Sequence, residues 1–184
     1  MPLPAPAPRR HLHQRRVECQ GYERQDGLFD IDARITDQRS YDLMRPDGRL
    51  ARGGEPVHDM WLRLTVDQDL RIVAVVASTD TAPFTTCSGG AAQMQRLVGE
   101  RIGAGFTRRT RELLGGALGC THLVELLGPA ATTAFQTLVH VRFAAPDRLD
   151  PQGRPVKIDS CYAYAANRDV VRERWPEHFT GEQA

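Results

Sequence analysis

The chain has 184 residues, 41% of them hydrophobic and 26% charged, which is typical of a soluble globular protein with one domain and short extensions. The 24 basic and 23 acidic residues give a net charge of +1, so charge favours neither nucleic acid nor a membrane surface as a partner. The sequence has no apolar run long enough to cross a bilayer and no apolar core of a secretory signal, so we expect a cytoplasmic protein whose four cysteines form no structural disulfides.

The first half of the chain predicts an antiparallel sheet. Residues 17–22 can form a strand, and after an Asp-Gly turn signal at 26–27, residues 28–37 alternate apolar and polar side chains as a half-buried strand does. The alternation recurs at 57–66, and the Val- and Ile-rich run at 70–77 is typical of a central strand. These segments predict a meander of about four strands.

The second half changes to a helical periodicity. Apolar side chains recur every three or four residues, which predicts helices at 87–98, 106–114 and from 121 to about 141. Further on, residues 158–164 are expected to be extended and residues 169–174 to form a short helix. Strands followed by helices indicate an α+β fold, in which an N-terminal antiparallel meander is packed by C-terminal helices.

We expect the chain to divide into three parts. Residues 1–12 are rich in proline and predict a disordered arm. Residues 13–145 would form a single α+β domain that binds a metal. Residues 146–184 would be a C-terminal extension that folds back on the domain, because its tyrosine and tryptophan side chains are costly to leave in water.

The metal prediction starts from the segment 119–123, which carries Cys120 and His122 in a corner between two predicted helices. The glycine of this corner can end one helix, and Thr121 can cap the next. Thiolate and imidazole together suit zinc or iron. We expect two residues from earlier segments to join them, which gives a mixed ligand set of His58, Cys87, Cys120 and His122.

The number of ligands decides what such a site does. Four ligands would close it and make it structural, whereas three would leave a position open for water or substrate. In the open case, Cys120 and His122 are the candidates for catalysis. The sequence leaves open whether Asp59, Asp80 or Cys161 joins the site. Without a metal, the two cysteines of the set would be small buried residues at helix starts.

Part of the chain resembles iron–sulfur scaffold proteins of the IscU/NifU type. Residues 56–64 are similar to a strand start of those proteins, with His58 where they carry a cysteine. The loop that contains Cys87 is similar to the second ligand loop of those proteins. Leu97-Val98-Gly99 is similar to the end of the helix that follows that loop, and residues 120–123 are similar to the final ligand segment. The resemblance implies an IscU/NifU-like fold and a role as an iron–sulfur carrier or scaffold.

A closer resemblance is to a bacterial family of domains of unknown function, DUF 2889. The segments that carry it are His58-Asp59-Met60, Cys87, Leu97-Val98-Gly99 and residues 119–123. This resemblance brings no activity with it.

Three functions are therefore open. The first is a transition-metal-binding protein that acts as a small metal-dependent enzyme on a small molecule. The second is a non-catalytic carrier that docks on a metal- or cluster-accepting protein. The third is a metal-free thiol enzyme with Cys87 or Cys120 as nucleophile and His122 as base. Zinc or iron is the expected cofactor, iron also as an iron–sulfur cluster. No nucleic-acid or membrane partner is expected, and a monomer and a homodimer are both open.

Overall fold

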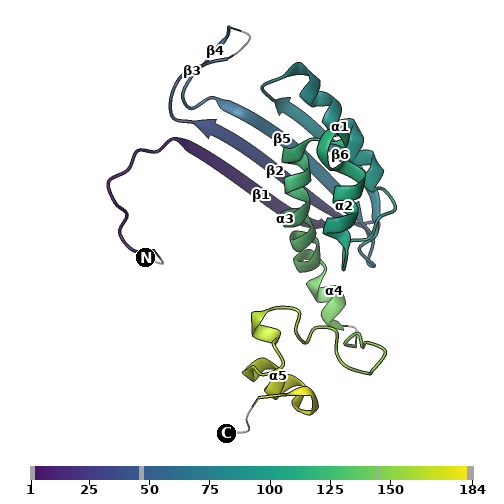
Figure 1. The fold of residues 1–184 in the computed structure, drawn as a ribbon. Helices are drawn as coiled ribbons and strands as arrows, with labels where there is room; N and C mark the ends of the chain where they lie inside the picture. Colours follow the sequence, from purple (N-terminus) through teal and green to yellow (C-terminus); the bar gives the residue numbers. More distant parts are fainter. Residues whose placement is uncertain (1–2, 46–47, 145, 182–184) are drawn as a thin grey trace. The chain divides into compact units, whose positions relative to one another are not determined.

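The computed structural model describes residues 3–45, 48–144 and 146–181 (Figure 1). Outside this part lie residues 1–2 of the predicted arm, residues 46–47 and 145 of the predicted domain, and residues 182–184 of the predicted extension. The chain divides into two compact units, one up to Leu138 and one from Val139. Residues 3–12 are exposed and form neither helix nor strand. The packing of the extension against the domain stays a prediction.

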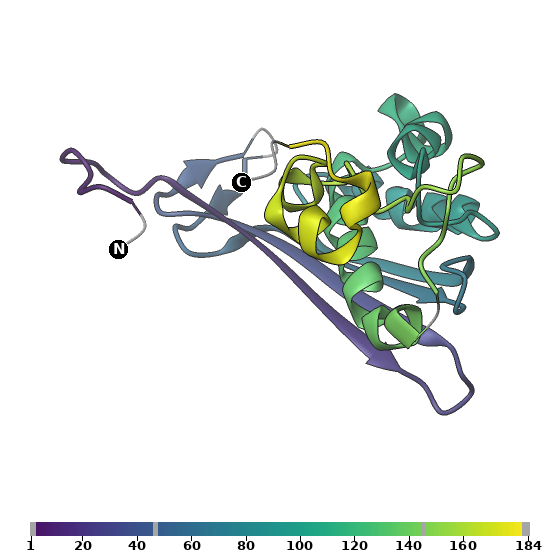
Figure 2. The ribbon, with the colours of Figure 1, turned by 90° about the horizontal axis from the view of Figure 1, so that it is seen from below.

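The first unit contains the predicted antiparallel sheet. Its strands are β1 (His13–Glu23), β2 (Phe29–Arg39), β5 (Pro56–Val66) and β6 (Ile72–Thr81), hydrogen-bonded in the order β1-β2-β5-β6. Figures 1 and 2 show β1 and β2 side by side along their whole length. A two-stranded hairpin, β3 (Leu43–Met44) with β4 (Leu50–Ala51), is inserted between β2 and β5. The prediction of an α+β fold with a four-stranded meander is confirmed.

Alternation along the strands separates a buried face from an outer face. On β2 the side chains of Phe29, Ile31, Ala33 and Ile35 are buried, and the residues between them are half-buried. On β5 the matching buried face contains Met60, Leu62, Leu64 and Val66. This face is the apolar layer on which the helices pack.

One long helix covers this layer. α3 (Thr121–Thr137) packs against β1, β2 and β5, and Figure 1 shows it crossing the sheet. Its buried side chains are Leu123, Leu126, Leu127, Ala130 and Ala134. Pro129 lies inside the helix without ending it. α3 stops at Thr137, and α4 (Val139–Ala144) follows after Leu138, so the helix predicted to run to about residue 141 is divided.

The remaining helices of the first unit are short. α2 (Phe106–Leu114) occupies the predicted range, and a 3-10 turn (Gly116–Leu118) follows it. The continuous helix predicted at 87–98 is wrong. The segment is a 3-10 turn, the five-residue α1 (Gly89–Gln93) and a second 3-10 turn (Met94–Leu97). The physical reason is the pair of glycines that opens α1, because glycine disfavours helix by about 1 kcal/mol relative to alanine.

The second unit has a small core of its own, in which Ile158, Val171 and Trp175 are buried. The short helix predicted at 169–174 is confirmed as α5 (Asp169–Arg174), and a 3-10 turn (Pro176–His178) follows. The extended segment predicted at 158–164 is wrong. It consists of turns and a 3-10 turn (Tyr162–Tyr164), and Asp159 has a left-handed φ of 63°, which interrupts an extended backbone. None of the helices in the described ranges is long and apolar enough to span a membrane.

Candidate metal centre

At one end of the apolar layer the sheet carries polar side chains instead. In the strand register, Arg15 of β1 is paired with Asp37 of β2, and Asp37 is paired with His58 of β5. Directly paired residues of neighbouring strands point to the same face. Three polar side chains therefore form a row under the N-terminal end of α3, and the register of the sheet holds them there.

Asp37 is the centre of this row, and its side chain is only 2% exposed. Arg15 donates from Nε to Oδ1 at 2.7 Å and from Nη2 to Oδ2 at 2.8 Å. His13 Nε2 lies 3.1 Å from Oδ1, and His58 Nδ1 lies 3.0 Å from Oδ2. His122 Nε2 is 3.7 Å from the same Oδ2. A buried carboxylate with this many donors is fixed in position and ionised.

The pKa of Asp37 reflects two opposing effects. Burial alone would raise it, because a charge loses hydration inside the protein. The hydrogen bonds and charge of Arg15, followed by those of His58, outweigh burial and lower the pKa of Asp37 to about 2. For His58, folding favours the uncharged form of the side chain. Burial and the charge of His122 lower the pKa of His58 despite its bond to Asp37.

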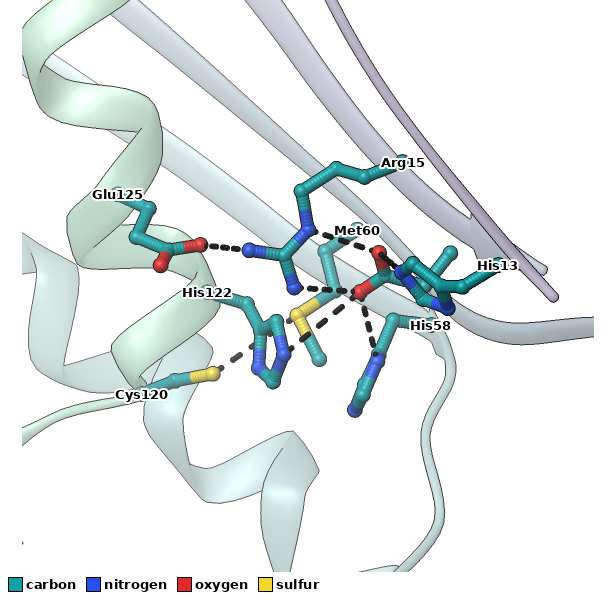
Figure 3. Close-up of polar contacts among 8 residues, drawn as sticks. His13, Arg15, His58, Met60, Cys120, His122 and Glu125 are labelled. Carbon is teal, nitrogen blue, oxygen red and sulfur yellow. Dashed lines mark hydrogen bonds and ion pairs between the residues drawn. The ribbon is translucent and has the colours of Figure 1, made fainter. Parts of the chain in front are cut away.

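The start of α3 brings the second group of side chains to the row. Figure 3 shows Cys120, His122 and Glu125 reaching from the helix toward the residues on the strands. The rings of His58 and His122 lie 3.7 Å apart between centroids, at 31°. Glu125 accepts a hydrogen bond from Arg15, which therefore bridges two carboxylates. Cys120 Sγ lies 3.8 Å from Met60 Sδ.

The predicted cap of this helix is wrong by one residue. Cys120 occupies the N-cap position with an extended backbone, and Thr121 is the first helical residue. The glycine before it also has an extended backbone and does not form the left-handed end of a helix. The extended backbone of Gly119 and Cys120 links the preceding 3-10 turn to the start of α3.

Three of the polar side chains are close enough together to hold one metal ion. Ligand atoms of Asp37, His58 and His122 all lie within 4.8 Å of one another. Across the described ranges of the chain, no other group of three or more His, Cys, Asp or Glu side chains meets this condition. Sequence reasoning found both histidines of the cluster and missed the aspartate.

A signal for Asp37 was present in the alternation of β2. The apolar positions 29, 31, 33 and 35 place residue 37 on the same buried face. A carboxylate at that position must be paired in the interior, which marks it as a candidate for function.

The two predicted cysteine ligands lie beside the cluster. Cys87 and Cys120 line a cavity of about 660 Å³ together with His58 and His122. Neither sulfur belongs to the group whose ligand atoms lie within 4.8 Å. The predicted segments thus meet at one cavity, while the binding of metal by the cysteines stays a prediction.

The further candidates have other contacts. Asp59 is adjacent to His58 in β5 and forms two hydrogen bonds, of 2.9 and 2.7 Å, with Arg34. Asp80 accepts a hydrogen bond from Ser78 at 3.0 Å. Cys161 is an exposed thiol of the second unit.

Comparison with known proteins places the chain in a family without assigning it an activity. No curated protein and no solved structure matches the chain. The resemblance to iron–sulfur scaffold proteins of the IscU/NifU type therefore has no support from these comparisons. The model of the family described as "Protein of unknown function (DUF2889)" matches residues 13–136, which include β1 and nearly all of α3, and the chain belongs to this family.

Proposed function

We propose that Asp37, His58 and His122 hold a divalent transition metal, and that the protein is a small metal-dependent enzyme acting on a small molecule in the adjoining cavity. The single observation that carries the proposal is the convergence of the three ligand atoms within 4.8 Å. Two imidazoles and one carboxylate form a recurrent ligand set for catalytic zinc and for non-haem iron, and both leave coordination positions open.

The spacing of the ligand atoms supports this proposal. Bonds of about 2.1 Å in a tetrahedral geometry separate neighbouring ligand atoms by roughly 3.4 Å. Asp37 Oδ2 lies 3.0 Å from His58 Nδ1 and 3.7 Å from His122 Nε2. The two distances lie on either side of the required value, and the ligand atoms of the third pair, His58 and His122, lie within 4.8 Å of each other, so side-chain shifts would admit an ion.

The charges around the site also support a cation. Arg15 is shared between Asp37 and Glu125, so one positive charge faces two negative ones. With both histidines neutral, the cluster has a net charge of −1. A divalent ion would change the net charge from −1 to +1, and it would replace the close contact of two imidazoles by a shared bond to the metal.

In an alternative arrangement, Asp37 would not bind the metal itself and would instead accept a hydrogen bond from a histidine ligand. His58 Nδ1 can donate its hydrogen to Asp37, which leaves Nε2 unprotonated. Carboxylate–histidine–metal arrangements of this kind orient the ring and raise its basicity. Cys120 or Cys87, on the wall of the same cavity, would then complete the ligand set. A bound ion would supply Lewis-acid activation of a small molecule in the cavity.

A metal-free thiol enzyme is the second candidate, and one observation favours it. A hydrogen bond donated by His58 Nδ1 to Asp37 would orient the ring as in a catalytic triad, and Cys87 and Cys120 line the same cavity as that ring. Among the described residues, the thiol of Cys120 hydrogen-bonds to Met60 Sδ at 3.8 Å and not to an imidazole. The metal proposal therefore has the stronger geometric support.

The test is metal binding by the full chain. Protein purified without added metal is analysed for its metal content, stripped with a chelator and titrated with Co²⁺, whose visible spectrum reports coordination. We expect one equivalent to bind, and His58→Gln and His122→Gln each to weaken binding at least roughly 100-fold. His11→Gln, in the exposed arm, is the matched control.

Each outcome of the titration decides between the candidates. Equal Co²⁺ binding by wild type and both cluster variants would overturn the proposal. A thiolate-to-metal charge-transfer band that disappears in Cys120→Ala or Cys87→Ala would add that cysteine to the ligand set. Acid-labile sulfide with iron in the purified protein would favour a cluster carrier. Rapid alkylation of Cys87 or Cys120 by iodoacetamide, in protein that binds no metal, would favour the thiol enzyme.

A further inference from the structure

The cavity beside the two histidines contains an arginine that the metal cluster does not use. Arg96 follows α1 and lines the same cavity as His58 and His122. Its Nη1 donates to the carbonyl oxygen of Leu113 at 3.1 Å. This bond occupies one of five guanidinium donors, so the group is anchored and still has donors for a ligand.

Arg96 differs from most arginines near the site in its surroundings. Arg15 and Arg34 are each held by buried or half-buried carboxylates. No aspartate or glutamate lines the cavity, and among the residues that the structure describes Arg96 has no ion-pair partner. An anchored guanidinium without a carboxylate of its own is suited to an anion from outside.

The cavity also has an apolar wall. Phe84 and Leu118 line it and are 61% and 47% exposed, which is high for large apolar side chains. Glycines form another part of the wall, so the backbone can approach a ligand there. A volume of about 660 Å³ is within the range of small-molecule sites.

We propose that the cavity binds a small organic carboxylate with an apolar body, and that this is the substrate class of the enzyme. The carboxylate pairs with Arg96, the apolar body packs on Phe84 and Leu118, and the opposite end of the molecule reaches the histidine pair. This assignment rests on the proposed metal-dependent function. One guanidinium, with no second arginine or lysine in the lining, favours a singly charged carboxylate over a phosphate ester.

The experiment uses benzoate as probe, with benzamide as its uncharged counterpart and acetate as the anion without the ring. Binding to the full chain is measured by saturation-transfer NMR, before and after loading with Co²⁺. We expect benzoate to bind more tightly than either comparison compound. Arg96→Gln should weaken benzoate roughly tenfold or more and leave benzamide unchanged. Arg108→Gln, an exposed arginine of α2, is the matched control.

A second variant tests the apolar contact. Phe84→Ala removes an exposed ring, so it should leave the fold intact and weaken benzoate while leaving acetate unchanged. Equal binding of benzoate and benzamide by a protein that does bind Co²⁺ would overturn the carboxylate proposal and leave the metal proposal standing. Arg96-dependent benzoate binding by a protein that binds no metal would overturn the metal proposal instead.

Discussion

Replacing Asp37 by asparagine tests the centre of the cluster, because the amide keeps the shape of the side chain and removes its charge. The pKa of Asp37 is about 2 against an ordinary 3.8, and the difference corresponds to about 2 kcal/mol favouring the ionised form in the folded protein. In metal-free protein at pH 7 we therefore expect Asp37→Asn to lower the free energy of unfolding by about 2 kcal/mol.

The pH dependence gives this prediction a distinctive sign. The pKa of Asp37 is lowered by folding, so its contribution is complete above the unfolded value of 3.8 and is lost as pH falls toward 2. The stability difference between wild type and variant should be constant near neutral pH and shrink between pH 4 and about 2. Taking the difference removes the titration of the other carboxylates.

The assay is urea unfolding followed by circular dichroism, with a chelator present, at several pH values. Asp26→Asn is the matched control, because that carboxylate pairs with Arg24 in an exposed turn. The control should change stability by less than about 1 kcal/mol. If Asp37→Asn is as stable as wild type at pH 7, the carboxylate is not held as the structure indicates, and the argument for a preformed site fails.

Three further predictions concern close packing and metal linkage. Gly90→Ala should lower the free energy of unfolding in urea by about 1–3 kcal/mol, because the new Cβ would lie 2.6 Å from the Cβ of Cys120, the N-cap residue of α3. Gly89→Ala is the control, because a Cβ at Gly89 would meet open space and should not destabilise the protein. Gly21→Ala should be at least as damaging, because its Cβ would overlap the hydroxyl of Thr137 and separate β1 from α3; Gly128→Ala is the helix control. Zn²⁺ at 100 times its dissociation constant should stabilise wild type by about 2.7 kcal/mol, and loss of this effect in Asp37→Asn would tie the metal to the cluster. Thermal or urea midpoints measure all three.

The sheet could be predicted from the sequence because its signal is local. β2 and β5 alternate apolar and polar side chains over about ten residues, β6 is marked by its Val- and Ile-rich run, and the Asp-Gly turn fixes the first hairpin. The segment after β6 could not be predicted in the same way. Its apolar residues, such as Met94 and Leu97, fit a helical period, but the glycines at its start lower helix propensity and divide it into short turns.

The candidate site was predicted only in part, because its centre depends on strand register. His58 and His122 could be identified as residue types suited to metal, and the structure brings their rings together. Asp37 is the last residue of the strand predicted at 28–37, and a polar residue is ordinary at a strand end, although the alternation places it on the buried face. Its pairing with Arg15 on one side and His58 on the other follows from the alignment of three strands, which no local pattern specifies.

The two histidines are the part of the cluster that a purely structural role explains least. Arg15 alone would neutralise the buried carboxylate of Asp37 with two short hydrogen bonds. Burial disfavours protonation of His58, and so does His122, whose ring centroid lies 3.7 Å from that of His58, because a charge on one ring repels a charge on the other. The arrangement therefore keeps a neutral imidazole next to an ionised carboxylate at the edge of a cavity. Neutral imidazole and ionised carboxylate are the protonation states that a metal ion requires of its ligands.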